Sequence, residues 1–258
     1  MTSRFISPDQ LVEGHEDVVI VDVRRSWEYE NGHIPGAVNI PFDDFRDPTD
    51  TLPGKLPTPG ALETLLGENG ISNADRTVSY GGEFGVYASR FLVTMEIFGH
   101  DIDLLQILDS DYDAWTNQYT SSTESPNIPF TQYHCERTGS GPLITANELE
   151  AALDTDAVIV DTRDPLEYDT VHVPGAINFQ WRDLVDENDR QLKPRSRCRE
   201  ILSEHDITFD RPVRLYCNTA RRLSFVYTVL RELGHHDVAF YEGGINAWAE
   251  YGGPVETT

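Results

Sequence analysis

VVIVDVRRSWEYENGHIPGAVNIPF, residues 18–42, is repeated as AVIVDTRDPLEYDTVHVPGAINFQW, residues 157–181. The two stretches align without a gap. Each contains a short β-branched run that ends in Asp-x-Arg, then a Glu-Tyr pair, then a His-x-Pro-Gly-Ala turn. The matched residues of the first copy are Asp22, Arg24, Glu28, His33, Pro35, Gly36 and Asn39, and those of the second are Asp161, Arg163, Glu167, His172, Pro174, Gly175 and Asn178.

The similarity continues outside these two stretches in the same order. RTVSY at Arg76 aligns with RPVRL at Arg211, Gly99-His100 aligns with Gly234-His235, and Trp115 aligns with Trp248. An ordered series of this kind indicates an internal duplication. We predict a first domain over residues 1–118, a linker over 119–142 that is rich in Ser, Thr, Gly and Pro, and a second domain over 143–258.

In each copy, short apolar strands alternate with helical stretches. VVIVD, TVSY and VRLYC have the β-branched composition of buried strands, whereas ASRFLVTMEIF and RRLSFVYTVLREL have the length and spacing of helices. Alternation of this kind predicts an α/β fold, with a mainly parallel sheet flanked by helices in each of the two domains.

The net charge of the chain argues against anionic binding partners. The chain has 20 Lys and Arg against 44 Asp and Glu, a formal net charge of −24 at pH 7. Such a field repels phosphates, so we expect neither nucleic acid nor a membrane as a partner. The charge is spread along the chain, and in this the composition resembles the proteins of halophilic archaea. With no apolar segment of membrane-spanning length and no signal-like N-terminus, the expected location is cytoplasmic.

The three cysteines are Cys135, Cys198 and Cys217. Their odd number and the absence of a C-x-x-C spacing argue against a disulfide framework and against a structural zinc site. We expect neither a metal nor a cofactor.

Cys217 lies at a position in the sequence that favours a catalytic role for its thiol. It follows the strand-like run VRLY and precedes a helix that starts near Arg222. In parallel α/β folds, ligands bind at the carboxyl ends of strands, where loop N–H groups and a helix N-terminus attract anions. Arg221 and Arg222 add positive charge. A buried inert thiol and a metal ligand are the alternatives, and the polar sequence NTARR favours a nucleophile.

The two Asp-x-Arg…Glu-Tyr…His-x-Pro-Gly-Ala segments, together with the cysteine loop, resemble the tandem-domain rhodanese family of thiosulfate and 3-mercaptopyruvate sulfurtransferases. The resemblance implies that Cys217 takes a sulfane sulfur from a small-molecule donor as a persulfide. Cys217 then passes the sulfur to cyanide, a thiol or a sulfur-acceptor protein. It also implies a substrate-binding loop made of Asn218, Thr219, Ala220, Arg221 and Arg222. For Arg163, contact with the donor and a structural ion pair are both open, as is the choice between thiosulfate and 3-mercaptopyruvate.

The first copy lacks the nucleophile, because the alignment places Gly82 where the second has Cys217. We therefore expect the first domain to be catalytically silent. Two other functions compete with sulfur transfer. A phosphatase of related fold needs Cys-x5-Arg, whereas Arg222 follows Cys217 after only four residues. A persulfide carrier or docking module is the second alternative, and the intact cysteine loop argues against pure docking.

Overall fold

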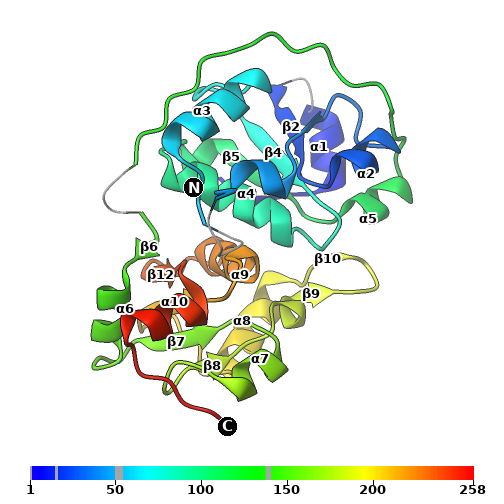
Figure 1. Cartoon of the computed structure of the whole chain (residues 1–258). Coiled ribbons are helices and arrows are strands. Elements are labelled where there is room, and N and C mark those ends of the chain that lie inside the picture. Colours follow the sequence, from blue (N-terminus) through cyan, green and yellow to red (C-terminus); the bar gives the residue numbers. More distant parts are fainter. Residues whose placement is uncertain (1, 15–16, 50–54, 138–140) are drawn as a thin grey trace. The chain divides into compact units, whose positions relative to one another are not determined.

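The computed structural model of the protein describes residues 2–14, 17–49, 55–137 and 141–258 (Figure 1). The chain forms two compact units. The first comprises residues 1–49, 56–139 and 187–192, and the second comprises residues 50–55, 140–186 and 193–258. Residues 187–192, which the sequence places in the second domain, thus group with the first unit.

The first unit is built on a five-stranded parallel sheet in the order β1-β5-β4-β2-β3. Its strands are β1 (Phe5–Ile6), β2 (Val19–Asp22), β3 (Val38–Asn39), β4 (Thr77–Tyr80) and β5 (Leu105–Leu108). The helices are α1 (Pro8–Gly14), α2 (Ser26–Glu30), α3 (Pro59–Glu68), α4 (Val86–Ile97) and α5 (Tyr112–Thr116), with 3-10 turns η2 (Phe42–Phe45) and η3 (Ile102–Leu104).

The second unit repeats this plan with a sheet in the order β6-β12-β11-β7-β8, also parallel. Its strands are β6 (Leu143–Ile144), β7 (Val158–Asp161), β8 (Ile177–Asn178), β11 (Val213–Tyr216) and β12 (Val238–Tyr241). The helices are α6 (Ala146–Ala152), α7 (Pro165–Thr170), α8 (Arg195–Glu204), α9 (Arg221–Glu232) and α10 (Gly244–Tyr251), with the 3-10 turn η4 (Trp181–Leu184). The strands β9 (Val185–Asp186) and β10 (Gln191–Leu192) form a separate two-stranded sheet. The predicted fold class is therefore confirmed.

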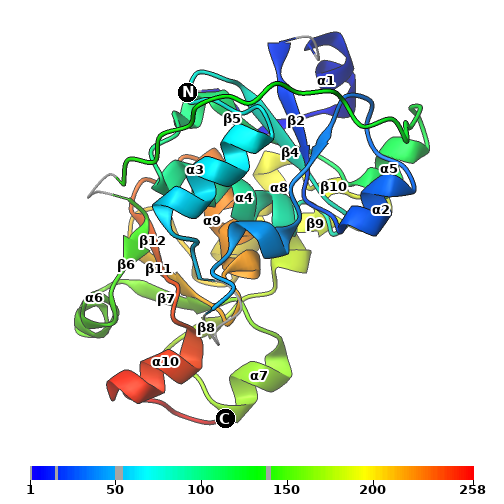
Figure 2. The same ribbon diagram turned by 45° about the horizontal axis from the view of Figure 1, so that its top comes forward.

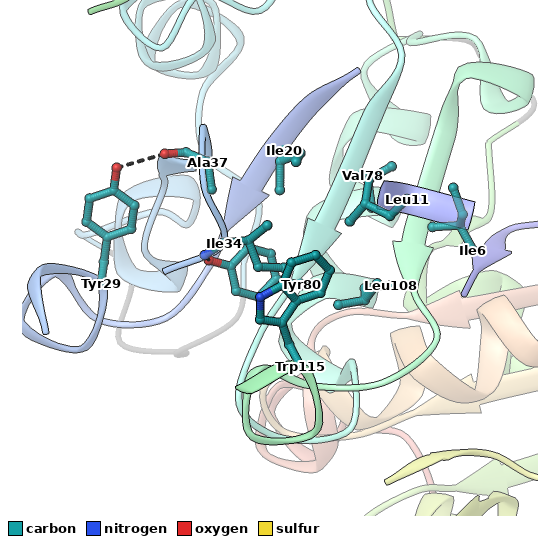
Figure 3. Packing of buried hydrophobic residues seen from close by; sticks show 10 residues of the cluster. All are labelled: Ile6, Leu11, Ile20, Tyr29, Ile34, Ala37, Val78, Tyr80, Leu108 and Trp115. Carbon is teal, nitrogen blue, oxygen red and sulfur yellow. Dashed lines mark hydrogen bonds between the residues drawn. The ribbon is translucent and has the colours of Figure 1, made fainter. Parts of the chain in front are cut away.

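Helices cover both faces of each sheet, and the strands β4, β5 and β7 are accordingly buried along their whole length. In the first unit, α1, α2 and α5 lie on one side of the strands and α3 and α4 on the other (Figure 2). Side chains from α1, α2 and α5 pack on the sheet in one cluster: Ile6, Leu11, Ile20, Tyr29, Ile34, Ala37, Val78, Tyr80, Leu108 and Trp115 (Figure 3). The Tyr29 hydroxyl donates to the Ala37 carbonyl at 2.7 Å, which gives this otherwise apolar cluster a polar anchor.

The sheet register corrects one detail of the repeat alignment. β2 pairs Asp22 with Tyr80, and β7 pairs Asp161 with Tyr216. Counted from the strand, Gly81 and not Gly82 is therefore the residue that matches Cys217. Counted back from the left-handed residue before each helix, Gly85 before α4 and Ala220 before α9, the match is Gly82. The loop of the first repeat is one residue longer, and the sequence alignment could not show on which side of the loop the extra residue falls.

The predicted linker, residues 119–142, includes residues 138–140, which lie outside the described residues. Residues 119–137 lie against the first unit without forming a helix or an extended strand (Figure 1, green trace). Backbone hydrogen bonds join this segment to the unit at three places: His33 with Ser122, Gly67 with Thr131, and Phe98 with Glu136. At Gly99 (φ +88°) a Cβ atom would lie 2.4 Å from the Glu136 carbonyl oxygen, so the close approach requires glycine.

Over the described residues, none of the helices combines the length and the apolar character needed to cross a membrane.

Candidate active site

Cys217 lies directly after β11, and its side chain is buried. The loop is short: Asn218, Thr219 and Ala220 separate the cysteine from Arg221, the first residue of α9. Ala220 adopts the left-handed conformation (φ 56°, ψ 0°) that turns the chain into the helix. The backbone N–H groups of such a turn and of the first helical residues lack intrahelical partners, so the loop can hold an anionic sulfur atom.

The start of α10 packs against the cysteine loop. Gly244 has φ +67°, and a Cβ atom built on it would lie 3.2 Å from the Cys217 carbonyl oxygen. Both the left-handed backbone and the close approach favour glycine at this position. The loop is thus supported by the exit of β12 as well as by its own helix.

Glu167, near the start of α7, contacts both ends of the loop. One carboxylate oxygen accepts from Asn218 Nδ2 at 2.7 Å, and the other accepts from Arg222 Nη2 at 2.9 Å. Asp164 forms a second ion pair with Arg222, at 3.0 Å. Burial opposes the charge of Arg222, but Cys217, Glu167 and Asp164 together outweigh it and raise the pKa of the guanidinium.

Burial also works against ionisation of Glu167. The Asp164 N–H and the positive charge of Arg222 reverse this effect, and the pKa of Glu167 is lowered. The carboxylate therefore stays ionised at neutral pH beside the loop.

Arg221, the other arginine of the loop, donates from Nε to the Thr219 hydroxyl at 3.1 Å. This bond lies within the loop itself and aligns two of its predicted members. Three of the residues expected in the substrate-binding loop, Asn218, Arg221 and Arg222, thus have side-chain partners that hold them at the loop.

Arg163 is placed differently from the loop arginines. Its side chain is only 2% exposed, and its Nε and Nη2 atoms donate to the carboxylate of Asp161 at 2.6–3.0 Å. Nη2 also donates to the Val171 carbonyl at 2.6 Å, and the guanidinium lies over the Tyr216 ring. These contacts favour the structural alternative for Arg163 over contact with a donor. Arg24 and Asp22 form the same pair in the first repeat.

The two other cysteines have environments unlike that of Cys217. Burial, with the nearby Glu63 carboxylate, raises the pKa of Cys135 to about 12, so its thiol is protonated at neutral pH. Cys198 is buried in α8, where its Sγ contacts the carbonyls of Leu184 and Lys193. Neither stands at a strand exit beside a helix N-terminus.

The matching loop of the first repeat, residues 81–85, has no cysteine, and two arginine side chains lie close to it. The Arg24 guanidinium lies 3.6 Å above the Tyr112 ring, and a Cβ atom on Gly82 would be 3.7 Å from Arg24 Cδ. Arg190, which groups with this unit, lies over Phe84 in the loop, 4.8 Å from the ring centroid. These contacts support the expectation that this repeat is catalytically silent.

An apolar cavity of about 210 Å³ in the first unit is a less plausible reaction site. It has no cysteine, and its lining offers no ionisable side chain apart from the Tyr119 phenol. The residues around it are Leu11, Val12, Ile20, Ile34, Pro35, Trp115, Tyr119 and Thr120. The loop that begins at Cys217 has the nucleophile and the charged groups that this cavity lacks.

Sequence reasoning missed Glu167, Asp164 and Gly244 as members of the site. A signal for Glu167 was present, because the Glu-Tyr pair occurs in both repeats. However, only the folded chain shows that this glutamate reaches a loop far along the sequence. The His172 ring stacks on Tyr168 and bonds to its carbonyl, and Asn178 Nδ2 donates to the Asp161 and Arg163 carbonyls, as expected of structural residues.

Comparison with known proteins agrees with this geometry. The rhodanese-like domain model matches residues 7–118 and 145–251. The chain is 32% identical to a thiosulfate sulfurtransferase of Pseudomonas aeruginosa, over 98% of this chain and 95% of that protein. It is 30% identical to a thiosulfate sulfurtransferase of Azotobacter vinelandii, over 93% and 90% of the two chains.

Among solved structures, the chain is similar to SseA from Escherichia coli, which is described as a 3-mercaptopyruvate enzyme of rhodanese fold. The TM-score is 0.84 at 25% identity, covering 94% of this chain and 99% of that one. The two matches to one domain model account for the duplicated sequence and the duplicated sheet. The chain therefore belongs to the rhodanese family, with two rhodanese-like domains in tandem.

Proposed function

We propose that the protein is a thiosulfate sulfurtransferase that works through a persulfide on Cys217. The Cys217 thiolate attacks the sulfane sulfur of thiosulfate, the sulfur–sulfur bond of the donor breaks, and sulfite leaves with the electron pair. A thiophilic acceptor such as cyanide or a thiol then attacks the terminal sulfur. The bond between the two sulfurs breaks, and the Cys217 thiolate is regenerated.

The observation that carries the proposal is the position of Cys217. It lies at the exit of a central parallel strand, within a short loop that closes on the N-terminus of α9, and Arg222 stands in the first turn of that helix. The relatives named thiosulfate sulfurtransferase support the choice of donor, whereas the similarity to SseA makes 3-mercaptopyruvate the donor to test beside it.

Phosphatase activity fits this loop less well. Arg222, the residue that would bind a phosphate, is already paired with the carboxylates of Asp164 and Glu167. The spacing between Cys217 and Arg222 is also one residue shorter than the Cys-x5-Arg that a phosphatase of related fold needs to enclose a phosphate.

The proposal is tested by mass spectrometry of the intact protein after incubation with thiosulfate or with 3-mercaptopyruvate. We expect a gain of one sulfur atom that is lost on adding cyanide. Cys217→Ser abolishes both the mass gain and turnover, because a serine hydroxyl cannot form a persulfide.

Cys198→Ser and Cys135→Ser are the matched controls and keep most of the activity. Loss of sulfur loading in either of them, with Cys217 intact and the fold unchanged by circular dichroism, would refute the assignment. A persulfide formed from 3-mercaptopyruvate alone would overturn the choice of thiosulfate while leaving Cys217 as the acceptor.

A further inference from the structure

The carboxylate of Glu167 spans the two ends of the loop that begins with Cys217. It accepts from Asn218, which directly follows the cysteine, at 2.7 Å, and from Arg222, in the first turn of α9, at 2.9 Å. A single side chain thus ties the start of the loop to its end. Charge-assisted hydrogen bonds of this length are among the stronger polar contacts in proteins.

Glu167 is itself held firmly. Its carboxylate accepts from the Asp164 N–H at 3.1 Å, in the capping box that starts α7. That helix begins just after Arg163, which is buried and paired with Asp161 at the end of β7. The contact therefore connects the loop after β11 to a rigid element that follows the neighbouring strand.

The carboxylates that contact Arg222 also change the net charge beside the loop. The Arg222 guanidinium faces two carboxylates, Glu167 at 2.9 Å and Asp164 at 3.0 Å, and its side chain is only 17% exposed. These three groups together carry one net negative charge. Attraction of an anionic donor therefore rests on the loop N–H groups, the helix N-terminus and Arg221.

Comparison with the first repeat shows that the contact between the glutamate and an arginine of the loop is specific to the repeat that has the cysteine. Glu28 matches Glu167 and makes the same capping contact, with the Arg25 N–H at 3.2 Å. However, Arg25 replaces Asp164, and Tyr87 occupies the position of Arg222 when the helices are aligned on Gly85 and Ala220. The glutamate is common to both repeats, whereas its ionic partner on the loop is present only beside Cys217.

We propose that Glu167 is a positioning residue that also determines donor specificity. It holds the sulfur-accepting loop at both ends and, with Asp164, cancels the charge of Arg222, so that the site discriminates against sulfane donors according to their negative charge. This inference rests on the proposed function. It predicts that the two carboxylates lower the preference of the native site for dianionic sulfane donors, such as thiosulfate, relative to monoanionic ones.

Two donors with the same sulfonyl–sulfane bond test the idea. Thiosulfate carries two negative charges and methanethiosulfonate carries one. In Glu167→Gln the amide keeps one loop contact, and the Asn218 side chain can rotate to keep the other, but the charge is gone. We expect the ratio of kcat/KM for thiosulfate to that for methanethiosulfonate, measured with cyanide at low ionic strength, to rise about fivefold.

Glu28→Gln in the first repeat is the matched control and leaves the ratio within about twofold, a change within the usual context-dependence of such effects. Asp164→Asn removes the more exposed carboxylate, at 67% exposure, and raises the ratio in the same direction by a smaller factor, which keeps the test available if Glu167→Gln does not fold. An unchanged ratio in a folded Glu167→Gln protein, or in Asp164→Asn if only that variant folds, would overturn the proposal.

The outcome is separable from that of the proposed function. If the native protein forms no Cys217 persulfide with either donor, the sulfurtransferase assignment fails. If the persulfide forms with both donors but the ratio does not respond to the carboxylates, only the specificity role of Glu167 fails.

Discussion

The backbone at Ala220 is strained because an alanine occupies a position that favours glycine. It is buried and has φ 56°, a conformation that costs a residue with a Cβ atom about 1 kcal/mol, whereas the matching residue of the first repeat is Gly85 with φ 82°. The loop beside Cys217 keeps this backbone because Glu167 and the helix after it hold both ends. Strain of this kind is common at reactive loops.

Three substitutions test this account. Ala220→Gly relieves the strain but loses a buried methyl worth about 0.8 kcal/mol, so we expect the free energy of unfolding to stay within about 0.5 kcal/mol of the native value. Ala220→Val should lose about 2 kcal/mol or more, because a β-branched side chain tolerates positive φ poorly. Gly85→Ala should lose about 1 kcal/mol. Urea denaturation measures the free energy of unfolding of all three variants. A strongly stabilised Ala220→Gly would show that the relief of backbone strain outweighs the loss of the buried methyl group.

At the scale of single residues, the sequence predicts the nucleophile Cys217 but not Glu167, which holds the loop around it. Cys217 is recognisable because a strand-like run, a cysteine and a helix adjoin one another in the chain. The role of Glu167 depends on a contact between residues far apart in sequence, and local pattern carries no information on such a contact. The burial of Arg163, which decides between its two roles, likewise follows only from packing.

Among the elements, the segment at residues 187–192 was the least predictable. The predicted bounds of the second domain, residues 143–258, include it, yet it groups with the first unit. Arg190 donates from Nε and Nη2 to the buried carboxylate of Asp111 at 2.8 and 2.5 Å, and it also pairs with Asp113 at 3.1 Å. The strands and helices that surround the site, by contrast, follow directly from the alternating pattern of the sequence.

Arg190 should therefore contribute to stability. Arg190→Ala removes the guanidinium from the Asp111 carboxylate, which is fully buried and also accepts from the Ala114 N–H in the cap of α5. We expect a loss of about 2 kcal/mol in the free energy of unfolding, less than for a fully buried pair because Arg190 is partly exposed. Thermal unfolding at fixed salt concentration measures it.

Arg197→Ala is the control, because Arg197 pairs with Glu200 and Glu204 on the exposed side of α8. It should cost less than about 0.5 kcal/mol. Equal effects of the two substitutions would show that the Asp111 pair adds no more than a surface ion pair does.

For the whole molecule, the dominant quantity is the net charge of −24. A thiosulfate dianion must approach against this field, which at low ionic strength extends over tens of ångströms. The local anion-binding groups are confined to the loop and the start of α9. The sequence alone predicts that the negative field of the whole molecule opposes the positive field of the loop. Only the structure shows that two carboxylates neutralise Arg222, which weakens the positive field of the loop further.

We expect kcat/KM for thiosulfate to rise as KCl is added, over the range in which circular dichroism shows the protein to be folded. Screening weakens the long-range repulsion more than it weakens the contacts within the loop. The monoanionic donor methanethiosulfonate provides the comparison and should respond less, because it carries half the charge of thiosulfate. A fall in kcat/KM for thiosulfate in the folded protein would mean that the local positive field dominates.

The packing of residues 119–137 against the first unit changes how the two halves of the chain can be separated. A polar segment rich in Ser, Thr and Pro would ordinarily be the preferred site of proteolytic cleavage. Here its backbone is bonded at His33, Gly67 and Phe98, so a protease must first detach it from the surface that it covers. A fragment cut at residue 118 would lose this covering and expose the glycines beneath it, whereas one that ends near residue 137 would keep these glycines covered. The first unit therefore extends well beyond the last residue of its internal repeat.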